Sequence, residues 1–497
     1  GADAGAVPEN DAQVVVVGAG PVGLLAAIAL SKRGFRNIRV FDRRPELPAP
    51  DDTMWGTPGF GGDERASRFA GLGARGQRAL NRFGALERVD RWSRTTFGAV
   101  EFHQDGRPPR VSMHRKLRPV RTIAVDRLAS CLREEIQEKC PGVEVRYFTE
   151  CEAVEFHADG ARLSMRRRRE RREPRADAEP SGGGSSGSSF QVDADFVIGA
   201  DGRESVVRNA MLRAGAAAHW TELRDRCPVL FKMLPLGMPA DARLDLEYYA
   251  SQPGVSIRAM PSMEGPLGGL MLFRRGSGTA AKLSSKGSVR RWFASKFPKW
   301  PYPFLSDAEL DALAQRPARS VPPFAYCGPA LHLGSRAALV GDAIHAMKPY
   351  VGLGVNSGLE DVSVLDNCLW RADGGLSQAL AAFSAQRAPD ARSLVEMQHG
   401  LDQPGRLRTL LFVVGPAKVD ALCCRLLPSV FSPSVFKLFD GCSLPFAQIQ
   451  VMKRRDRKLQ LAVLALAVVV SGVSFGRLVY LVRTFLLWPL IEALLFG

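Results

Sequence analysis

Three glycines near the start of the chain have the spacing of a phosphate-binding turn. Gly18, Gly20 and Gly23 form the pattern G-x-G-x-x-G. The pattern lies between a β-branched run at residues 14–17 and a segment whose apolar residues recur at helical spacing. Such glycines allow a tight turn, a close approach of a pyrophosphate and close packing of the helix on the strand. With the free N–H groups of the helix start, the motif predicts a site for FAD or NAD(P).

An acidic residue follows where a ribose contact is expected. Residues 38–41 have the composition of a second strand, and Asp42 ends it, which completes a βαβ unit. The carboxylate of Asp42 is therefore expected to accept hydrogen bonds from the adenosine ribose. Arg43 and Arg44, which come next, would also suit a 2′-phosphate.

Two later motifs also place aspartate and glycine directly after an apolar run. Asp201 and Gly202 follow residues 196–200, and a longer motif at residues 341–361 follows residues 337–340. Apolar runs of this length are typical of strands buried in a parallel sheet. Turns at the carboxyl ends of such strands form ligand sites.

Together the three motifs resemble those of the FAD-dependent aromatic-ring hydroxylase family of flavoprotein monooxygenases, over about residues 13–400. The resemblance implies that FAD is the cofactor, that NAD(P)H is a transient electron donor and that dioxygen supplies the oxygen atom. The three motifs would then converge on one FAD molecule. Because the cofactor does the bond-making in such enzymes, no side chain is assigned a catalytic role, and Pro349 and Gly352 are expected near the flavin ring.

The third motif also has the chemistry of a flavin site. Asp342 would accept a hydrogen bond from a ribityl hydroxyl, and Gly352 and Gly354 would let the ring edge approach the backbone. A helix beginning near Asn356 would point its positive end at the part of reduced flavin that carries negative charge. The cofactor-binding candidates are Gly18, Gly20, Gly23, Asp42, Arg121, Asp201, Gly202, Gly341, Asp342, Pro349, Gly352, Gly354, Val355 and Asn356.

The chain departs from the family pattern in two places. Where the family has an Arg that reaches the flavin nucleotide, this chain has Val125, and Arg121 is the nearest basic residue. One family member binds a substrate carboxylate with an Arg and a Tyr, and the corresponding positions here are Ala99 and either Met113 or His114. Neither Ala nor Met can form such a two-point clamp, so a less acidic substrate is expected.

The fold class expected is α/β, a Rossmann-like FAD-binding domain with an inserted β-sheet-rich substrate domain and a C-terminal helical membrane tail. The divisions are a flexible N-terminal arm (1–12), the FAD-binding domain (13–215 and 326–400) with a disordered Arg/Gly/Ser insertion at a hairpin tip (166–190), the substrate domain (216–325), a helical C-terminal region (401–458) and a membrane anchor (459–497).

The composition argues against nucleic-acid and metal chemistry. The net charge of +16 is concentrated in two basic blocks, residues 166–175 and 453–458, so a basic groove for nucleic acid is poorly supported. Nine Cys without a C-x-x-C pair and seven scattered His provide no metal-binding pattern. We therefore expect reduced thiols and no bound metal.

The C-terminal residues have the composition of a membrane anchor. Residues 459–476 carry no charged side chain, and a helix of this length spans about 27 Å at ~1.5 Å per residue, close to the bilayer core. The basic block just before this segment predicts that the main body lies on the positive-inside face. Residues 484–497 are too short for a confident second span. The small polar residues that follow Gly1 suggest removal of a transit peptide, so a plastid or mitochondrial membrane is the expected location, with a purification scar as the alternative.

Three functions remain open from the sequence. The favoured one is a membrane-associated FAD-dependent monooxygenase that hydroxylates or epoxidises an aromatic or isoprenoid-like small molecule. A flavin-dependent reductase of the same fold is the second. The third is a catalytically reduced or inactive structural subunit of an organellar membrane complex, for which the changes at Val125 and Ala99 are the support.

Overall fold

The computed structural model describes residues 11–56, 69–113, 119–168, 188–238, 242–263, 267–304, 306–371, 375–441 and 443–470. Its centre is a six-stranded sheet in the order β20-β21-β12-β1-β2-β8. The strands are β20 His332–Leu333, β21 Ala337–Leu339, β12 Phe196–Gly199, β1 Gln13–Val17, β2 Asn37–Phe41 and β8 Val143–Arg146. All neighbours pair in parallel except β20 and β21. The strands expected at residues 14–17, 38–41, 196–200 and 337–340 are therefore confirmed.

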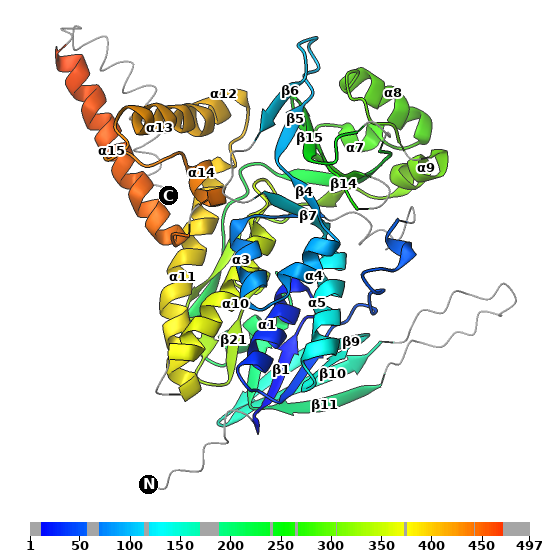
Figure 1. Cartoon of the computed structure of the whole chain (residues 1–497), viewed down its shortest axis with the longest axis vertical. Helices are drawn as coiled ribbons and strands as arrows, with labels where there is room; N and C mark the ends of the chain where they lie inside the picture. The colour runs from blue at the N-terminus through cyan, green and yellow to red at the C-terminus, as the bar shows by residue number, and fades with distance from the viewer. Residues whose placement is uncertain are drawn as a thin grey trace, which may run out of the picture.

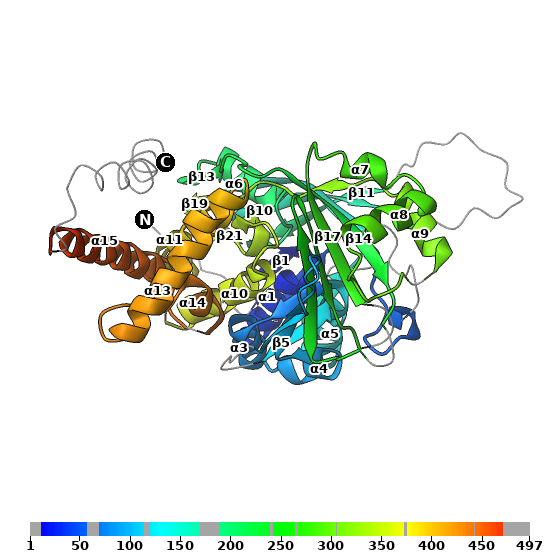
Figure 2. The ribbon, with the colours of Figure 1, turned by 90° about the horizontal axis from the view of Figure 1, so that it is seen from above.

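Helices cover this sheet (Figures 1 and 2). They are α1 Pro21–Lys32, α5 Val125–Lys139, α6 Val206–Arg213, α10 Leu353–Arg371 and α11 Gly375–Leu401, with α3 Ala74–Arg82 and α4 Leu86–Arg91 beside α10 and α5. Pro21 begins α1, at a position where the missing N–H costs nothing. Gly34 lies just after the end of the helix and has a φ of 97°. The βαβ unit is as the sequence predicts.

A second sheet of seven strands forms the other large layer, in the order β18-β14-β17-β16-β15-β5-β6. Its strands are β18 Arg319–Ser320, β14 Val229–Leu236, β17 Leu267–Arg274, β16 Val255–Met260, β15 Leu246–Gln252, β5 Gly98–Glu101 and β6 Arg110–Met113. Helices α7 Thr279–Lys282, α8 Lys286–Lys296 and α9 Asp307–Gln315 lie on one of its faces (Figure 2). The domain division expected from the sequence is wrong at this point. It assigns the residues of β5 and β6 to the FAD-binding part at residues 13–215, whereas both strands belong to the seven-stranded sheet.

Three smaller sheets complete the fold. They are β11-β10-β9, β13-β19-β22 and β3-β7-β4. Their strands are β9 Thr149–His157, β10 Gly160–Arg167, β11 Ser189–Ala194, β13 Ala218–Glu222, β19 Ala325–Pro329, β22 His345–Ala346, β3 Phe69–Leu72, β7 Val120–Ala124 and β4 Arg94–Thr96. Arg166 of β10 pairs with Ser189 of β11, so the Arg/Gly/Ser insertion joins two strands of a hairpin, while residues 169–187 lie outside the described ranges.

The C-terminal region is helical. It contains α12 Arg406–Thr409, the π-helix η4 Leu410–Val414, α13 Gly415–Leu426, α14 Val435–Gly441 and α15 Phe446–Val470. In Figures 1 and 2, α13 and α15 lie together at one end of the molecule. The expected anchor at 459–497 is described only to Val470, as the end of α15. Within the described ranges, no helix is both long and apolar enough to cross a membrane.

Candidate functional site

The glycine-rich turn lies where β1 meets α1, and it packs on the second motif. Gly18 has a φ of +106°, and a Cβ at this position would lie 2.4 Å from the carbonyl oxygen of Ala200. A Cβ on Gly23 would lie 1.9 Å from the oxygen of Gly18. Only glycine fits either position. Because Ala200 precedes Asp201, the first and second motifs are direct neighbours.

The third motif packs on the first through Val22. Gly341 has a φ of +68°, and its built Cβ would lie 3.3 Å from a methyl group of Val22. A Cβ on Gly358 would come within 2.7 Å of the other methyl group. The three motifs, which are far apart in the sequence, therefore meet around the N-terminus of α1, as the sequence predicts.

Open positions remain between the motifs, and they fit FAD. Cβ atoms built on Gly202, Gly352 and Gly354 meet no described atom within 4 Å. The helix start at Gly20 has no side-chain cap, and the first N–H groups of α10, at Leu353 to Val355, have no acceptor within the helix. These donors and bare backbone segments are what a pyrophosphate and a flavin edge require.

Asp42 directly follows β2, as expected, and its carboxylate has partners within the protein. Its carboxylate accepts hydrogen bonds from the N–H of Ala19 at 2.8 Å and from the backbone and guanidinium of Arg44 at 2.8 to 3.0 Å. Burial alone would raise the pKa of Asp42, but the hydrogen bonds and charge of Arg44 lower it below its ordinary value. The carboxylate that was expected to bind ribose is thus held by Arg44, which also lies 3.9 Å from a Cβ built on Gly20.

Asp201 has one carboxylate oxygen in use and one free. Oδ2 accepts hydrogen bonds from the N–H groups of Val206 (2.6 Å) and Val207 (3.2 Å), which open α6. Oδ1 is buried and has no partner among the described residues. Burial raises the pKa of Asp201 above its ordinary value. A buried acceptor beside Gly18 is consistent with a hydroxyl donor from the cofactor.

The third motif divides into exposed and buried members. Asp342 and Pro349 are exposed, and Gly352 lies in the left-handed region with a φ of +69°. The helix begins at Leu353, three residues before the expected start at Asn356. Asn356 is buried, and its amide donates to the carbonyls of Gly71 and Gly352 at 2.8 Å each.

The remaining amide oxygen of Asn356 accepts from the N–H of Gly73 at 2.8 Å. Both amide hydrogens and one of the two lone pairs of the amide oxygen are therefore used in hydrogen bonds within the protein. The side chain of Asn356 therefore joins the third motif to β3 and to the start of α3. A ligand would contact the backbone around Asn356 and not its amide group.

Arg121 has partners within the protein. It donates to Asp90 at 2.7 and 3.2 Å and to the hydroxyl of Thr95 at 2.5 Å. The charge of Arg121 is therefore paired within the protein, and its contact with the cofactor stays a prediction. Val125 begins α5.

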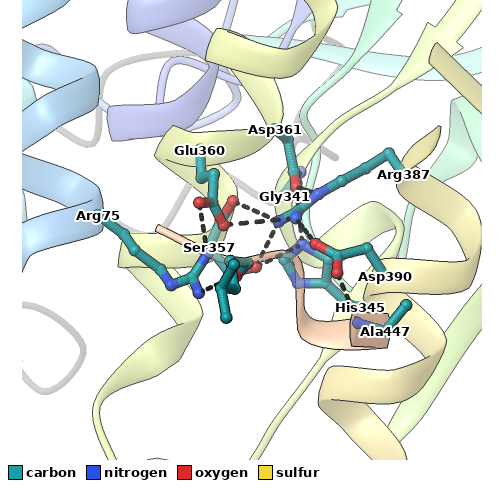
Figure 3. A network of polar contacts seen from close by, with 10 residues as sticks. Arg75, Gly341, His345, Ser357, Glu360, Asp361, Arg387, Asp390 and Ala447 are labelled. Atoms are coloured by element: carbon teal, nitrogen blue, oxygen red, sulfur yellow. Dashed lines mark hydrogen bonds and ion pairs between the residues drawn. The ribbon is translucent and has the colours of Figure 1, made fainter. Parts of the chain in front are cut away.

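A buried ion network behind the third motif escaped the sequence analysis (Figure 3). Arg387 has a side chain 1% exposed and pairs with Asp361 at 2.5 Å, with Asp390, and with Glu360 at 3.4 Å. Asp361 also accepts from the N–H of Gly341 at 2.7 Å and contacts Nε2 of His345 at 2.9 Å. The network thus fixes both ends of the motif.

Arg387 could have been found from its spacing. It lies four residues from the buried Phe383 and four from the buried Ala391, on the apolar stripe of α11. An arginine in such a stripe needs partners, and the Glu360-Asp361 pair that ends the third motif carries the matching charge.

A second buried cluster holds the segment around Pro349. The amine of Lys348 has no exposed surface and donates to Asp225 (2.7 Å), Asp402 (2.8 Å) and the carbonyl of Cys227 (2.8 Å). Tyr350 donates to Asp402 at 3.1 Å. Burial raises the pKa of Tyr350, and the charge of Asp402 raises it further. The cluster connects the flavin-facing segment to the chain before β14 and after α11.

The two positions that correspond to the relative's carboxylate clamp lie on neighbouring strands, β5 and β6. Ala99 pairs with Ser112, and Met113 pairs with Gly98, so Ala99 and Met113 project from opposite faces of the sheet. His114 lies outside the described residues. No group of three or more metal-ligating side chains occurs in the described part of the chain.

Comparisons with known proteins agree with this geometry. A family model described as "FAD binding domain" matches residues 11–268 and 330–398. Kynurenine 3-monooxygenase of Salinispora arenicola is 30% identical over 94% of this chain and 97% of its own length. The enzyme of the same name from Phaeosphaeria nodorum is 26% identical over 78% of this chain and 77% of its own length.

Solved structures show the same fold. The tetrameric form of 2-methyl-3-hydroxypyridine-5-carboxylic acid oxygenase has a TM-score of 0.56 at 20% identity, over 81% of this chain and 95% of that one. PqsL of Pseudomonas aeruginosa, a probable FAD-dependent monooxygenase, has a TM-score of 0.55 at 20% identity, over 80% and 98%.

The fold and the convergent motifs define a flavoprotein of the aromatic-hydroxylase type. The chain belongs to the FAD-binding domain family. It is a FAD-dependent monooxygenase related to kynurenine 3-monooxygenase.

Proposed function

We propose that this chain is a membrane-associated monooxygenase that uses NAD(P)H and dioxygen to hydroxylate or epoxidise an aromatic or isoprenoid-like small molecule. The observation that carries the proposal is the open space at Gly202, Gly352 and Gly354 where the three motifs meet. When bound there, FAD supplies the transfer of electrons from NAD(P)H to dioxygen and the insertion of one oxygen atom.

The protein's own residues bind and position. The uncapped start of α1 provides N–H groups for the pyrophosphate, and the start of α10 provides a positive end for the charge of reduced flavin. Asn356 and the Lys348 cluster hold the segment that contains Pro349 and Gly352 in place. A segment fixed at both ends is suited to hold the substrate at a constant position relative to the flavin and to exclude water.

The substrate is expected on one face of the seven-stranded sheet. A Cβ on Gly268 of β17 would overlap the ring of Phe69 in β3, so this face is the one turned toward the FAD-binding half. Ala99 lies on the same face, and Arg258 pairs across the strands with Tyr249 and Leu270 there.

The side chain of Arg258 is partly exposed on this face. In place of the missing clamp at Ala99, this side chain supplies one point of contact for an anionic substituent, and Tyr249 supplies a hydroxyl. We therefore infer a ring substrate whose carboxylate, where it carries one, is held at one point by Arg258 and not by a two-point clamp. Kynurenine, which the relatives' name implies, serves as the anionic probe.

Membrane association is the second part of the proposal. Its support is the uncharged run at residues 459–476 behind the basic block at 453–458. An organelle membrane, plastid or mitochondrial, with the main body on the positive-inside face is the expected location.

The flavin site is tested by a pair of glycine variants. Gly352 and Gly276 share a positive φ (+69° and +79°) and an open Cβ position, so Gly352→Val and Gly276→Val impose the same backbone strain. Only Gly352→Val is expected to lose the yellow flavin absorption and the oxygen-dependent oxidation of NAD(P)H. Equal flavin retention in both variants would place the flavin elsewhere.

Substrate contact is tested at Arg258. Arg258→Leu is expected to raise KM for kynurenine about ten- to hundredfold, since a charge-assisted hydrogen bond contributes about 1.5–3 kcal/mol, and to leave a neutral phenol unaffected. Wild-type protein that oxidises NAD(P)H without consuming oxygen would indicate a reductase. Colourless protein with a stable membrane partner and no turnover would indicate the structural subunit.

A further inference from the structure

Two stretches of chain that join the seven-stranded sheet to the rest of the fold run side by side. The first connection, residues 223–228, leads from β13 to β14, and the second connection, residues 321–324, leads back from β18 to β19. The N–H of Leu223 donates to the carbonyl of Phe324 at 2.8 Å. The two connections therefore meet at one place.

Lys348 lies against both connections at this place. Its amine donates to the carboxylate of Asp225 at 2.7 Å and to the carbonyl of Cys227 at 2.8 Å, both in the first connection. The amine also lies 5.7 Å from the centre of the Phe324 ring, in the second connection. Its other acceptor is Asp402, which follows α11, at 2.8 Å. One cation with a fully buried side chain thus joins both connections to the FAD-binding half.

The end of α11 adds further contacts to the two connections. Nε2 of His399 donates to the carbonyl of Arg224 at 2.9 Å, and the His399 ring packs edge-on against Phe324 with the ring centres 5.8 Å apart. Pro349 directly follows Lys348. The segment expected to face the flavin therefore begins at the cation that holds the connections.

The seven-stranded sheet is attached to the FAD-binding half at both ends of β17. Shortly before β17 begins, the carbonyls of Ser262 and Met263 accept hydrogen bonds from Arg94 of β4 at 3.2 and 3.0 Å. At its other end, Arg274 pairs with Val229, which directly follows the first connection. Because domains in one chain move relative to each other unless a contact restrains them, loosening one attachment would let the sheet tilt about the other.

We propose that Lys348 is a positioning residue that sets the tilt of the seven-stranded sheet, and with it the position of the substrate relative to the flavin. This inference rests on the oxygenase function proposed above. Without the amine, the carboxylates of Asp225 and Asp402 would face each other and repel, so the first connection would move away from α11. Displacement of a substrate by about 1 Å can cost about a hundredfold in rate.

The test compares Lys348→Met with Lys232→Met in the full chain. Lys232 is also a buried lysine, but its amine donates to the carbonyl of Leu313 at 2.7 Å, inside the substrate domain. Both substitutions remove a buried cation, and only Lys348→Met removes one that joins the sheet to the FAD-binding half.

Spin labels report the arrangement of the two parts without turnover. They are placed at Gln137→Cys on α5 and Ser295→Cys on α8, which are exposed positions in the FAD-binding half and on the seven-stranded sheet (Figure 1). The distance between the labels is measured by double electron–electron resonance. In all proteins the partly accessible Cys227, Cys423 and Cys424 and also Cys442 are first replaced by Ser.

We expect Lys348→Met to keep its flavin absorption and to show a broader distribution of distances between the labels. With kynurenine as the probe, the product formed per NAD(P)H consumed should fall about tenfold, within the hundredfold that a displacement of about 1 Å can cost. Hydrogen peroxide, formed when NAD(P)H reduces dioxygen without oxygen transfer, should account for the difference. Lys232→Met should match the wild type in both measurements.

An unchanged distance distribution in Lys348→Met would overturn the proposal, and so would a broader one with the wild-type yield of product. Loss of flavin at an unchanged distance would overturn it too, in favour of a role in cofactor retention. If Lys348→Met does not fold, Asp225→Ala takes its place, because Asp225 is 22% exposed and its loss leaves Lys348 paired with Asp402. An unchanged distance there would equally overturn the proposal. Wild-type protein that forms no product would count against the oxygenase function, whereas the distance measurement would still test Lys348.

Discussion

The Arg387 network and the Asp420 cluster bury similar charges in opposite surroundings. Around Arg387 the neighbouring helices place apolar side chains such as Leu359 and Phe383 in the interior, each with no exposed surface. Around Asp420 the charges form the interior, and Leu422 and Leu426 face outward. The Arg387 network is enclosed by an apolar core. The Asp420 cluster itself lies in the interior, where an apolar core would usually be found.

This difference determines what each cluster contributes. Behind the third motif, Arg387 pairs with Asp361, which in turn accepts a hydrogen bond from the N–H of Gly341 at 2.7 Å, so the ions fix the motif and the apolar core supplies the stability. In the C-terminal region the contacts that join α13 to α15 include ion pairs of Asp420 with Lys453 and Arg457 and a hydrogen bond from Gln460, so charged groups help to hold the two helices together.

Removing the cation from the enclosed cluster should have the largest effect. Arg387→Met leaves Asp361 and Asp390 buried without their main counter-charge, and breaking such a pair costs about 3–5 kcal/mol. We expect this loss in urea unfolding, accompanied by release of FAD. Arg392→Met is the matched control, because Arg392 is on the same helix, is 62% exposed and pairs only with Glu396. Its expected loss is about 0–1 kcal/mol, and equal losses would contradict the role given to Arg387.

Truncating leucines compares the two regions directly. Leu359→Ala, at a fully buried position of α10, should destabilise the protein by about 2–5 kcal/mol through lost burial and the cavity that remains. Leu422→Ala should change the free energy of unfolding in detergent-free solution by less than about 0.5 kcal/mol. Thermal and urea unfolding of both variants provide the measurement. A large loss for Leu422→Ala would mean that another part of the chain covers this side chain.

Much of the FAD-binding half could be predicted because its signals are local. The strand, glycine turn and helix of residues 13–42 follow from the apolar pattern and glycine spacing, and the third motif carries the same information. The membership of β5 in the second sheet could not be predicted, since it depends on pairing of Gly98 with Leu246 far along the chain.

Charge pairing was the other part that sequence alone did not reveal. Asp42 and Arg121 were assigned to the cofactor from their positions, and the structure adds that Asp42 pairs with Arg44 and Arg121 pairs with Asp90. Likewise, the basic block at 453–458 was interpreted as a flank of a membrane helix, whereas Lys453 is mostly buried against Asp420 and Asp456. A linear sequence gives the sign of a charge but not the acid that it meets.

A smaller, local effect is expected from the C-terminal cluster. Asp420→Asn removes the charge that faces Lys453 and Arg457 but keeps the shape, and Lys453 retains Asp456. The expected cost is about 1.5–3 kcal/mol, the range for hydrogen bonds to charged groups. Hydrogen exchange of α13 should rise while FAD absorption stays unchanged. Asp105→Asn, at an exposed aspartate that pairs with Arg107, should leave α13 unaffected.

The smallest expected effect is the dependence of stability on pH. It distinguishes the two regions because only one of them contains His residues. Burial lowers the pKa of His399, which lies beside Arg224 and near Lys348, below its ordinary value of about 6.5. Unfolded chains therefore take up a proton at His399 before the folded protein does, so stability is complete above pH 6.5 and is lost as the pH falls below it. His332 shifts in the same direction, whereas residues 406–466 contain no His.

We therefore expect the urea concentration at the unfolding midpoint to decrease when the pH is lowered from 7.5 to 5.5. Hydrogen exchange should become faster around α11 and not in α13. His399→Gln should reduce this pH dependence, and His219→Gln, at an exposed strand position, should not. A rise in α13 exchange of the same size would mean that the C-terminal helices unfold together with the FAD-binding half. The stability of the two regions would then be coupled.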